Sequence, residues 1–237
     1  MIPESRGLRL PAEVQVAQPP AGIGPRSGPM GSAPARLVLV RHTPVKGVQG
    51  LCYGRTDVDL PESFAQDAEA VRAALPPAPW TLYASPARRC RRLAEWLGGG
   101  VTTDPRLQEL DFGDWEGRAW NDLPRPELDR WCGDFVGLRP PGGEAFAELA
   151  ARAGDFAAEM AGRHAGGCVV AVTHAGVIRA LLAARSGLPY ADAFSIAVAP
   201  GSVHVLDTGC RRAGPGQSNI GLTGGNQPIK LLAKARS

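Results

Sequence analysis

Two short apolar runs, far apart in the chain, each lead to a histidine. The run at residues 37–40 leads to His42, and the run at residues 169–172 leads to His174. Runs of four aliphatic residues without polar alternation are typical of strands buried on both faces, as in a parallel sheet covered by helices. Because ligands bind such open sheets beyond the carboxyl ends of the strands, we expect both histidines to lie where a site would form.

Helical and extended patterns alternate through the rest of this region. Ser63 and Gln66 have the spacing of a capping box, and Ser85-Pro86 has the preferred order of N-cap and first helical residue. Strands that alternate with helices predict an α/β fold, with three α/β/α layers around a mostly parallel sheet. The predicted helices cover residues 64–75, 86–97, 146–160 and 177–186, and the further predicted strands cover residues 80–84 and 203–206.

The two ends of the chain differ in composition from its middle. Proline and glycine fill 12 of the first 34 positions, which exceeds the roughly 25–30% at which disorder becomes the expectation. We therefore predict a disordered leader at residues 1–34, of which residues 1–29 precede Met30 and should be dispensable. One domain is predicted at residues 35–207, followed by a basic, Gly-rich tail at residues 208–237 whose structure the sequence does not indicate.

Charge and cysteine content narrow the class of protein. The net charge of +3 includes +5 from residues 208–237 and +1 from residues 1–34, which leaves −3 for the predicted domain, so no nucleic-acid surface is expected. The longest apolar runs are far too short to span a membrane, and the chain does not open with a signal-peptide pattern. The five cysteines are widely spaced without a Cys-x-x-Cys pair, which predicts reduced thiols in a cytoplasmic protein, with no zinc site and no disulfide framework.

Basic residues near the predicted element ends suggest a phosphate site. The predicted helix after Ser85 has Arg89 in its first turn, where free backbone N–H groups and the helix dipole favour an anion. Arg41 directly precedes His42, and an arginine fork matches phosphate oxygens in pairs. Imidazole is a competent nucleophile toward phosphorus, and its usual pKa of ~6.5 leaves much of it neutral at physiological pH. These two arginines could therefore surround one phosphoryl group together with His42 and His174.

The acidic stretch at residues 109–116 supplies candidate proton donors. Hydrolysis of a phosphate monoester needs a proton delivered to the leaving oxygen, so one carboxyl group near the phosphate must be protonated part of the time. Four acids lie in this stretch, and repulsion between like charges would raise the pKa of one of them. We interpret Glu109 as the proton donor, and Asp114 and Glu116 as members of an acidic surface turn.

Together these segments resemble the histidine phosphatase superfamily, whose members share the phosphoglycerate-mutase-like fold. Arg41-His42 matches the family's Arg-His nucleophile motif, and residues 85–89 match its Ser-Pro-x-x-Arg segment, with Arg89 as the second phosphate arginine. Glu109 falls on the family's proton donor, and residues 173–176 carry its second histidine, His174. The resemblance extends over most of the predicted domain.

Within the superfamily, the chain looks most like the α-ribazole-5′-phosphate phosphatases of cobalamin synthesis. This likeness lies in residues 50–60, which read Gly-Leu-Cys-Tyr-Gly-Arg-Thr-Asp-Val-Asp-Leu. These enzymes frequently have Arg-His-Thr at the nucleophile, so Thr43 fits them, although the superfamily more commonly has glycine there. By this resemblance Arg55 and Thr43 would contact the phosphate or the substrate. Glu144, in a Pro-Pro-Gly-Gly-Glu loop, fits a substrate contact and a simple turn before a helix equally well.

The resemblance implies a two-step phosphatase mechanism without a metal or other cofactor. His42 attacks phosphorus while Arg41, Arg89 and His174 stabilise the equatorial oxygens. Glu109 protonates the leaving alcohol, and water then hydrolyses the phosphohistidine. The expected partner is a small-molecule phosphomonoester, with no nucleic acid and no membrane, and a homodimer stays open.

Two other functions stay open beside the phosphatase. A cofactor-dependent phosphoglycerate mutase would return the phosphoryl group to a bound acid, but mutases of this family carry a longer insertion between proton donor and second histidine. A non-catalytic protein that binds a phosphorylated ligand would not need both histidines, both arginines and the acid. The short separation of Glu109 and His174 therefore favours a phosphatase with an open pocket.

Overall fold

The structure is a computed structural model, and it describes residues 34–207. The predictions for the leader and for the tail at residues 208–237 fall outside this range. Within it, one five-stranded sheet has the order β3-β2-β4-β1-β5. Strands β1 to β4 are parallel, and β5 pairs antiparallel with β1, which confirms the predicted α/β fold with a mostly parallel sheet. The strands are β1 (Arg36–Arg41), β2 (Thr81–Ala84), β3 (Val101–Thr103), β4 (Cys168–Thr173) and β5 (Val203–Asp207).

The first and fourth strands are neighbours in the sheet. Arg36 pairs with Cys168 and Arg41 with Thr173, so β1 and β4 end level with each other. Just beyond the last pair, the backbone N–H of His42 donates to the Thr173 carbonyl at 3.0 Å. Both histidines therefore leave the sheet at the same edge, which is the edge where open parallel sheets bind ligands.

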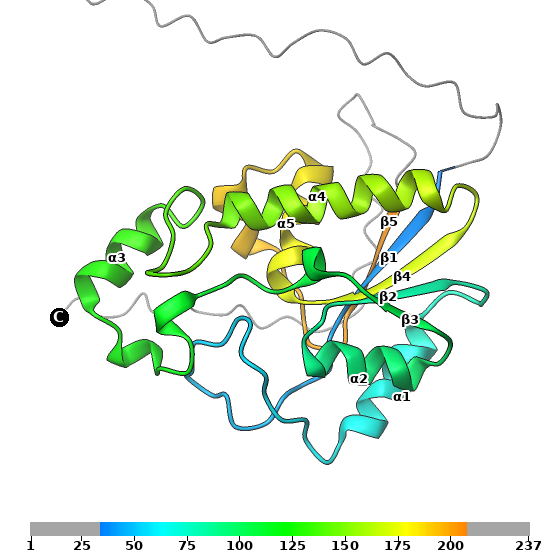
Figure 1. Cartoon of the computed structure of the whole chain (residues 1–237), viewed down its shortest axis with the longest axis horizontal. Helices are drawn as coiled ribbons and strands as arrows, with labels where there is room; N and C mark the ends of the chain where they lie inside the picture. Colours follow the sequence, from blue (N-terminus) through cyan, green and yellow to red (C-terminus); the bar gives the residue numbers. More distant parts are fainter. Residues whose placement is uncertain (1–33, 208–237) are drawn as a thin grey trace, which may run out of the picture. The chain divides into compact units, whose positions relative to one another are not determined.

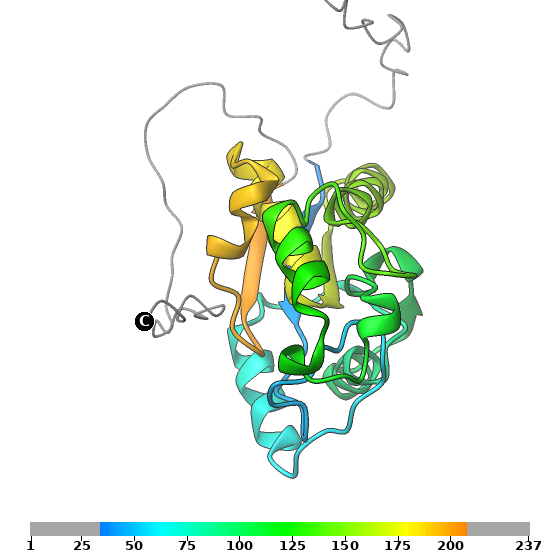
Figure 2. The same ribbon diagram turned by 90° about the vertical axis from the view of Figure 1, so that its left-hand side faces the viewer.

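Helices cover both faces of the sheet. In Figure 1, α1 and α2 lie on one side of the strands and α4 and α5 on the other, and the turned view in Figure 2 keeps α4 apart from α1 and α2. This arrangement gives the three layers that the alternation of strands and helices predicted. The helices are α1 (Phe64–Ala74), α2 (Arg88–Leu97), α3 (Arg125–Gly133), α4 (Phe146–Arg163) and α5 (Ala175–Ser186).

The side chains of β1 alternate between the two helical layers. Val38 and Val40 belong to the apolar cluster formed with α1 and α2, whereas Leu37 and Leu39 belong to the cluster formed with α4 and α5. All four side chains are fully buried. Because successive residues of a strand point to opposite faces, an unbroken apolar run is what a strand covered on both sides requires.

The start of α1 differs from the predicted capping box. Ser63 precedes the helix, but its backbone is already helical and its hydroxyl donates to the Asp67 carboxylate at 2.9 Å. No side-chain cap joins Ser63 to the backbone, so the box with Gln66 is not formed. The carboxylate one turn later is a charged acceptor, and it takes the hydroxyl away from the helix end.

The start of α2 also differs from its prediction. The helix begins at Arg88 with Ala87 at the N-cap position, two residues later than predicted. The Ser85 hydroxyl accepts from the backbone N–H of Ala87 at 3.3 Å, and it also lies 2.8 Å from a ring nitrogen of His174, a buried partner from another part of the chain. Arg89 still lies in the first turn of the helix, as predicted.

The connection between β3 and α4 is held by aromatic packing. Phe112, Trp115 and Trp120 all pack against Trp131, with ring centroids 5.9, 5.7 and 6.4 Å away. Besides α3, the connection contains the short 3-10 helices η1 (Pro105–Leu107), η2 (Gly113–Trp115) and η3 (Trp120–Asp122), and a further one, η4 (Tyr190–Ser195), follows α5.

No part of residues 34–207 forms a helix long and apolar enough to cross a membrane.

Candidate active site

His42 follows the last residue of β1 and is almost fully buried, with an exposed fraction of 3%. Its Nδ1 lies 2.8 Å from the carbonyl oxygen of Thr43. Because a carbonyl oxygen only accepts, Nδ1 must carry the proton, and the lone pair is left on Nε2. Burial, reinforced by the charges of Arg89 and Arg41, lowers the pKa of His42 to about 3. The ring is therefore neutral at physiological pH, which is the state that a nucleophile needs.

His174 precedes α5 and is fully buried beside His42, with the two ring centroids 5.3 Å apart. The Arg89 Nη2 lies 3.1 Å from His174 Nδ1, and a guanidinium only donates, so Nδ1 accepts and Nε2 carries the proton. Nε2 then donates to the Ser85 hydroxyl at 2.8 Å. Burial, followed by the charge of Arg89, holds the pKa of His174 well below its usual range.

Arg89 is held by a loop that joins β1 to α1. Its Nη1 donates to the Thr56 carbonyl at 2.9 Å, and its Nη2 donates to the Gly54 carbonyl at 2.6 Å. The guanidinium also lies over the ring of Tyr53, 5.6 Å from its centroid. Arg41, at the end of β1, donates from Nη1 to the Val198 carbonyl. Among residues 34–207, the Nε atoms of both arginines are buried without a hydrogen-bond partner.

Glu109 lies against the N-terminus of α5. Its carboxylate accepts from the backbone N–H of Leu110 at 3.0 Å and from that of Gly176 at 3.1 and 3.2 Å. A Cβ atom at position 176 would lie only 2.3 Å from the Glu109 Oε1, so the carboxylate occupies the space that a larger residue would need. Glycine at this position therefore allows the acid to lie against the N-terminus of α5 and to line the same pocket as His42.

A pocket of about 170 Å³ brings four of the five predicted catalytic residues together. Arg41, His42, Arg89 and Glu109 line it, whereas His174 lies behind them and does not reach its surface. The expected contact of His174 with phosphoryl oxygens therefore stays a prediction. The rest of the wall is mostly apolar and aromatic, and it includes Leu51, Tyr53, Phe112, Trp120, Phe146 and Phe194.

The other three predicted substrate contacts do not line this pocket. Arg55 pairs with the Asp111 carboxylate at 2.9 Å and with Glu144 at 3.4 Å. Glu144 mainly binds Arg152, at 2.7 and 2.8 Å. Thr43 is fully buried and enters the site through its backbone carbonyl, which accepts from His42. None of the three lines the pocket in this geometry, and their contacts with a substrate stay predictions.

One of the acids after Glu109 is bound by the loop between β1 and α1. Glu116 turns to the preceding loop, where it accepts from the backbone N–H of Arg55 at 2.7 Å, from that of Thr56 at 2.6 Å and from the Thr56 hydroxyl. Burial alone would raise the pKa of Glu116, but these hydrogen bonds hold it below its usual value. The prediction placed Glu116 in an acidic surface turn, with Glu109 as the proton donor. Glu116 instead fixes the loop whose carbonyls hold Arg89.

Sequence reasoning missed two residues of the site. Arg179, on α5, lines the pocket and is only 8% exposed; its Nε donates to the Ile196 carbonyl at 3.1 Å, and its guanidinium lies over Phe194. A lone arginine on the apolar face of the predicted helix was a usable signal. Ser85, which binds His174, had no such signal because its partner is 89 positions away.

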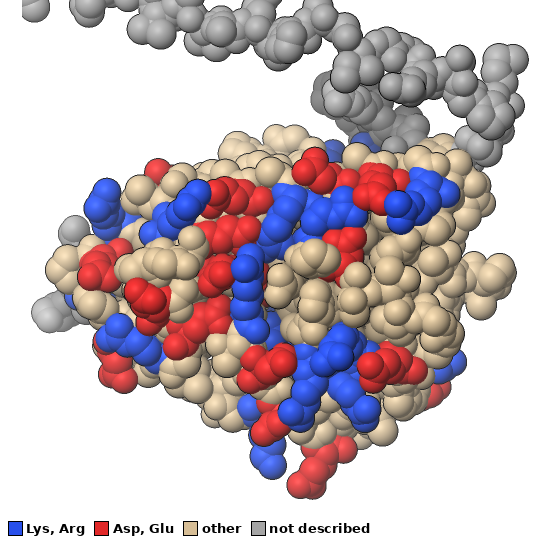
Figure 3. All heavy atoms as spheres, in the orientation of Figure 1, with Lys and Arg blue, Asp and Glu red and all other residues tan. Residues whose placement is uncertain are grey.

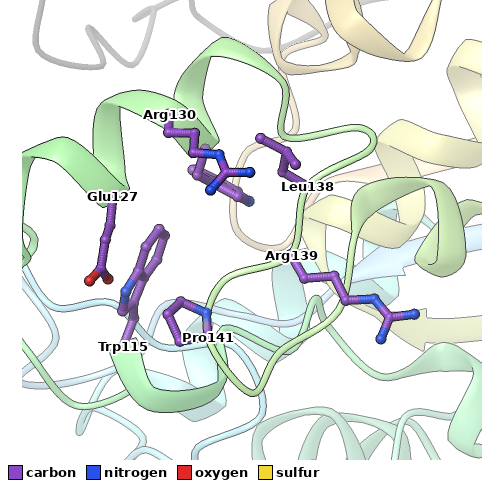
Figure 4. A pocket seen from close by; sticks show the side chains of 7 residues that line it. Trp115, Glu127, Arg130, Leu138, Arg139 and Pro141 are labelled. Carbon is purple, nitrogen blue, oxygen red and sulfur yellow. The ribbon is translucent and has the colours of Figure 1, made fainter.

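Two surface features lie outside this site. Figure 4 shows a hollow of about 180 Å³ bordered by Trp115, Arg130 and Pro141, and none of the predicted site residues lines it. On the face in Figure 3, basic and acidic side chains are interspersed, without one broad basic area. Within residues 34–207, no three His, Cys, Asp or Glu side chains are grouped as ligands for a metal ion.

Known proteins resemble this chain across the region that forms the site. Residues 37–214 match the family model described as histidine phosphatase superfamily (branch 1). The adenosylcobalamin/alpha-ribazole phosphatase of Salmonella typhimurium is 29% identical, over 73% of this chain and 90% of that protein. The glucosyl-3-phosphoglycerate phosphatase of Mycobacterium tuberculosis is 32% identical, over 66% of this chain and 78% of that protein. Phosphoserine phosphatase 1 of Hydrogenobacter thermophilus is 29% identical, over 75% and 88%.

A solved structure supports the same relationship. The alpha-ribazole phosphatase of Shigella flexneri superposes with a TM-score of 0.66 at 27% sequence identity. The match covers 73% of this chain and 90% of that one. The relatives agree in the type of reaction that their names describe and differ in the substrate.

Proposed function

The chain belongs to the histidine phosphatase superfamily (branch 1), and on that premise we propose that it hydrolyses a phosphomonoester through a phosphohistidine at His42. The observation that carries the proposal is the hydrogen bond between His42 Nδ1 and the Thr43 carbonyl, at 2.8 Å. It leaves the Nε2 lone pair unprotonated in a pocket that Arg41 and Arg89 also line.

In the first step, His42 Nε2 forms a bond to phosphorus while the bond from phosphorus to the leaving oxygen breaks. Arg41 and Arg89 stabilise the charge on the remaining phosphoryl oxygens, and we propose that these two cations make a metal ion unnecessary. The leaving alkoxide takes a proton from Glu109, which lines the same pocket.

In the second step, water attacks phosphorus and breaks the bond to His42. Glu109 is now ionised and takes the proton from the water, so the acid is restored when inorganic phosphate leaves. The neutral state of His42 makes it a suitable leaving group and returns the site to its starting form. His174 supports both steps by holding Arg89 through Nδ1.

The wall of the pocket supports a leaving group that is flat and apolar. Tyr53, Phe112, Trp120 and Phe194 line it. Aromatic walls bind flat rings by stacking and by burial of apolar surface. The benzimidazole of α-ribazole-5′-phosphate suits such a wall, and we propose this ester as the leading substrate.

A second candidate is a phosphorylated carboxylic acid, and Arg179 is the observation that favours it. Its Nε is bound to the Ile196 carbonyl, while Nη1 and Nη2 have no partner among the described residues and the side chain lines the pocket. A fixed guanidinium recognises a carboxylate in pairs of hydrogen bonds. Substrates such as phosphoserine, glucosyl-3-phosphoglycerate or the phosphoglycerate of a mutase carry that group.

The covalent intermediate is tested directly. After a rapid acid or base quench with labelled substrate, wild type should carry a label that is labile in acid and stable in base, and His42→Ala should carry none. We expect His42→Ala to lose at least about 1,000-fold in kcat, because the nucleophile itself is removed. Wild-type activity in this variant would refute the assignment of His42.

The substrate is tested by kcat/KM across esters that differ in the leaving group. We expect α-ribazole-5′-phosphate to exceed phosphoserine, glucosyl-3-phosphoglycerate and 3-phosphoglycerate. Arg179→Met distinguishes the two candidates, since it should raise KM about 10-fold or more only for an ester whose carboxylate Arg179 holds. Isomerisation of 3-phosphoglycerate faster than its hydrolysis would establish a mutase, and ligand binding without turnover of any ester would establish a binding protein.

A further inference from the structure

We infer that Arg152 is a positioning residue for the proton donor Glu109, and that Glu144 holds Arg152 in place for this task. The inference rests on the proposed phosphatase function. Arg152 lies on α4, does not line the pocket, and has a side chain that is 17% exposed. It acts on the backbone of the segment that carries the acid.

The guanidinium of Arg152 uses all five of its N–H groups. Nη1 donates to the carbonyls of Arg106 and Gln108, both at 2.7 Å, and Nη2 donates to the carbonyl of Glu109 at 3.1 Å. Nε and the remaining N–H of Nη2 donate to the two Glu144 carboxylate oxygens, at 2.7 and 2.8 Å. One side chain therefore holds three carbonyls of a four-residue stretch that ends at the acid.

The end of this stretch needs an external support because it has no regular ladder of its own. Residues 106 and 107 belong to η1, but residues 108–112 lie in no helix or strand, so their carbonyls depend on other partners when they are buried. Thr173 supplies a further hydrogen bond to this stretch, since its hydroxyl donates to the Leu107 carbonyl at 2.7 Å. Arg152 holds the stretch from the side of α4, and Thr173 holds it from the end of β4.

Glu144 fixes the direction of Arg152. The side-on pair of two hydrogen bonds orients the plane of the guanidinium, and the backbone N–H of Glu144 donates to the Asp111 carbonyl at 2.9 Å. Glu144 is thus tied to the same segment that Arg152 supports. A lysine could keep the positive charge but would offer only three donors from one point, without the planar fork.

The carboxylate of Glu109 is then held in two ways. Arg152 fixes its backbone, and the N–H groups of Leu110 and Gly176 fix its side chain. Proton transfer needs the donor within hydrogen-bond distance of the leaving oxygen, and a displacement of about 1 Å can cost on the order of 100-fold in rate. Loss of Arg152 should therefore impair proton donation more than it impairs nucleophilic attack.

Leaving-group dependence separates this role from a merely structural one. The phenolate of p-nitrophenyl phosphate departs without a proton, whereas the alkoxide of an alkyl phosphate needs one. We expect Arg152→Met and Arg152→Lys to lower kcat/KM for an alkyl phosphate by about 10- to 100-fold. The value for p-nitrophenyl phosphate should fall less than about threefold, the same selective pattern that Glu109→Gln should give.

Matched variants complete the test. Arg106→Met removes an arginine from the same segment, one that pairs with Asp104 and Glu159 and not with the acid, and it should leave both esters unaffected. In a Glu109→Gln background, Arg152→Lys should add little further loss on the alkyl ester, because the group that it positions is already gone.

Failure of the positioning role of Arg152 and failure of the proposed phosphatase function would give different results. Equal losses on both esters in the folded Arg152→Lys protein, or no loss on either, would overturn the positioning role and leave the phosphatase standing. Full additivity with Glu109→Gln would overturn it as well. Hydrolysis that survives His42→Ala in wild-type background would overturn the proposed function itself, and the positioning role with it.

Discussion

At the scale of single residues, burial beside arginines keeps both histidines of the site uncharged. His42 and His174 lie at the ends of neighbouring strands, and each is close to Arg89. A charged imidazole would lose its hydration and would lie near the positive charge of Arg89. Both effects favour the neutral form of the ring. The nucleophile is therefore ready without any preceding proton transfer, but the protein becomes sensitive to acid.

The free energy of unfolding should fall as the pH drops from about 6.5 toward 3. Native His42 binds its proton only near pH 3, and His174 does so well below its usual range, whereas in the unfolded chain both bind near 6.5. The unfolded state therefore holds more protons in this window, and acid favours it by up to about 1.4 kcal/mol per pH unit for each proton. Urea unfolding of wild type and His42→Asn at several pH values measures the effect.

Comparison of the two proteins isolates the histidine from the carboxylates that they share. The stability of His42→Asn should decline less steeply with acid than that of wild type. Parallel curves through the whole window would contradict the assignment of a depressed pKa to His42.

The same scale separates the residues that could be predicted from those that could not. His42 was predictable because it follows an apolar run, and Arg89 because Ser85-Pro86 indicates the start of a helix and the family resemblance selects this arginine. Arg152 and Ser85 were not, because each acts on a partner that only the folded chain brings near: Glu109 is 43 positions from Arg152, and His174 is 89 from Ser85. Glu144 was predicted from its loop as a possible substrate contact, but in the structure its carboxylate binds Arg152 on α4.

At the scale of elements, the N-terminus of α5 carries His174 and also binds the carboxylate of Glu109. His174 precedes the helix, and Gly176, in its first turn, donates to Glu109. The close approach depends on the missing side chain, since an added Cβ would lie 2.3 Å from the carboxylate. The helix end and the acid are therefore matched in shape as well as in hydrogen bonding.

Gly176→Ala should separate stability from activity. Displacement of the Glu109 carboxylate loses its hydrogen bonds to Gly176, but alanine is favoured over glycine in helices by up to about 1 kcal/mol, so the melting temperature should fall by no more than a few degrees. The displaced carboxylate should lower kcat/KM for an alkyl phosphate by about 10-fold or more. Gly154→Ala in α4, where an added Cβ meets nothing within 4 Å, is the control and should leave kinetics unchanged. Unchanged kinetics in Gly176→Ala would contradict the geometry described for Glu109.

The elements also show where local patterns stop being informative. Helices α1 and α4 follow from apolar spacing because each is long enough to repeat its period, whereas the buried strands β1 and β4 follow from unbroken apolar runs. β3 has only three residues, and α3 with the short 3-10 helices is organised by rings from Phe112 to Trp131. No period marks such a region, since its side chains meet across the connection rather than along one face.

At the scale of the whole molecule, two apolar clusters enclose one sheet, and the site lies at the edge where β1 and β4 end. The alternation of strands and helices was sufficient to predict these layers. The strand order was not predictable in the same way, because β4 lies between β1 and β2 although it comes long after both in the chain. Because β4 lies next to β1 in the sheet, His174 comes to lie beside His42.

The position of β4 also constrains how the chain reaches its native state. β1 pairs only with β4 and β5 in the described structure, and more than half of the chain separates it from either. During synthesis the first strand must therefore wait, apolar on both faces and without a neighbour, until β4 leaves the ribosome. The entropy cost of closing so long a loop arises before the contacts between the strands can stabilise the structure. We therefore expect slow folding, and we expect the unpaired strand to need protection from aggregation until β4 is available.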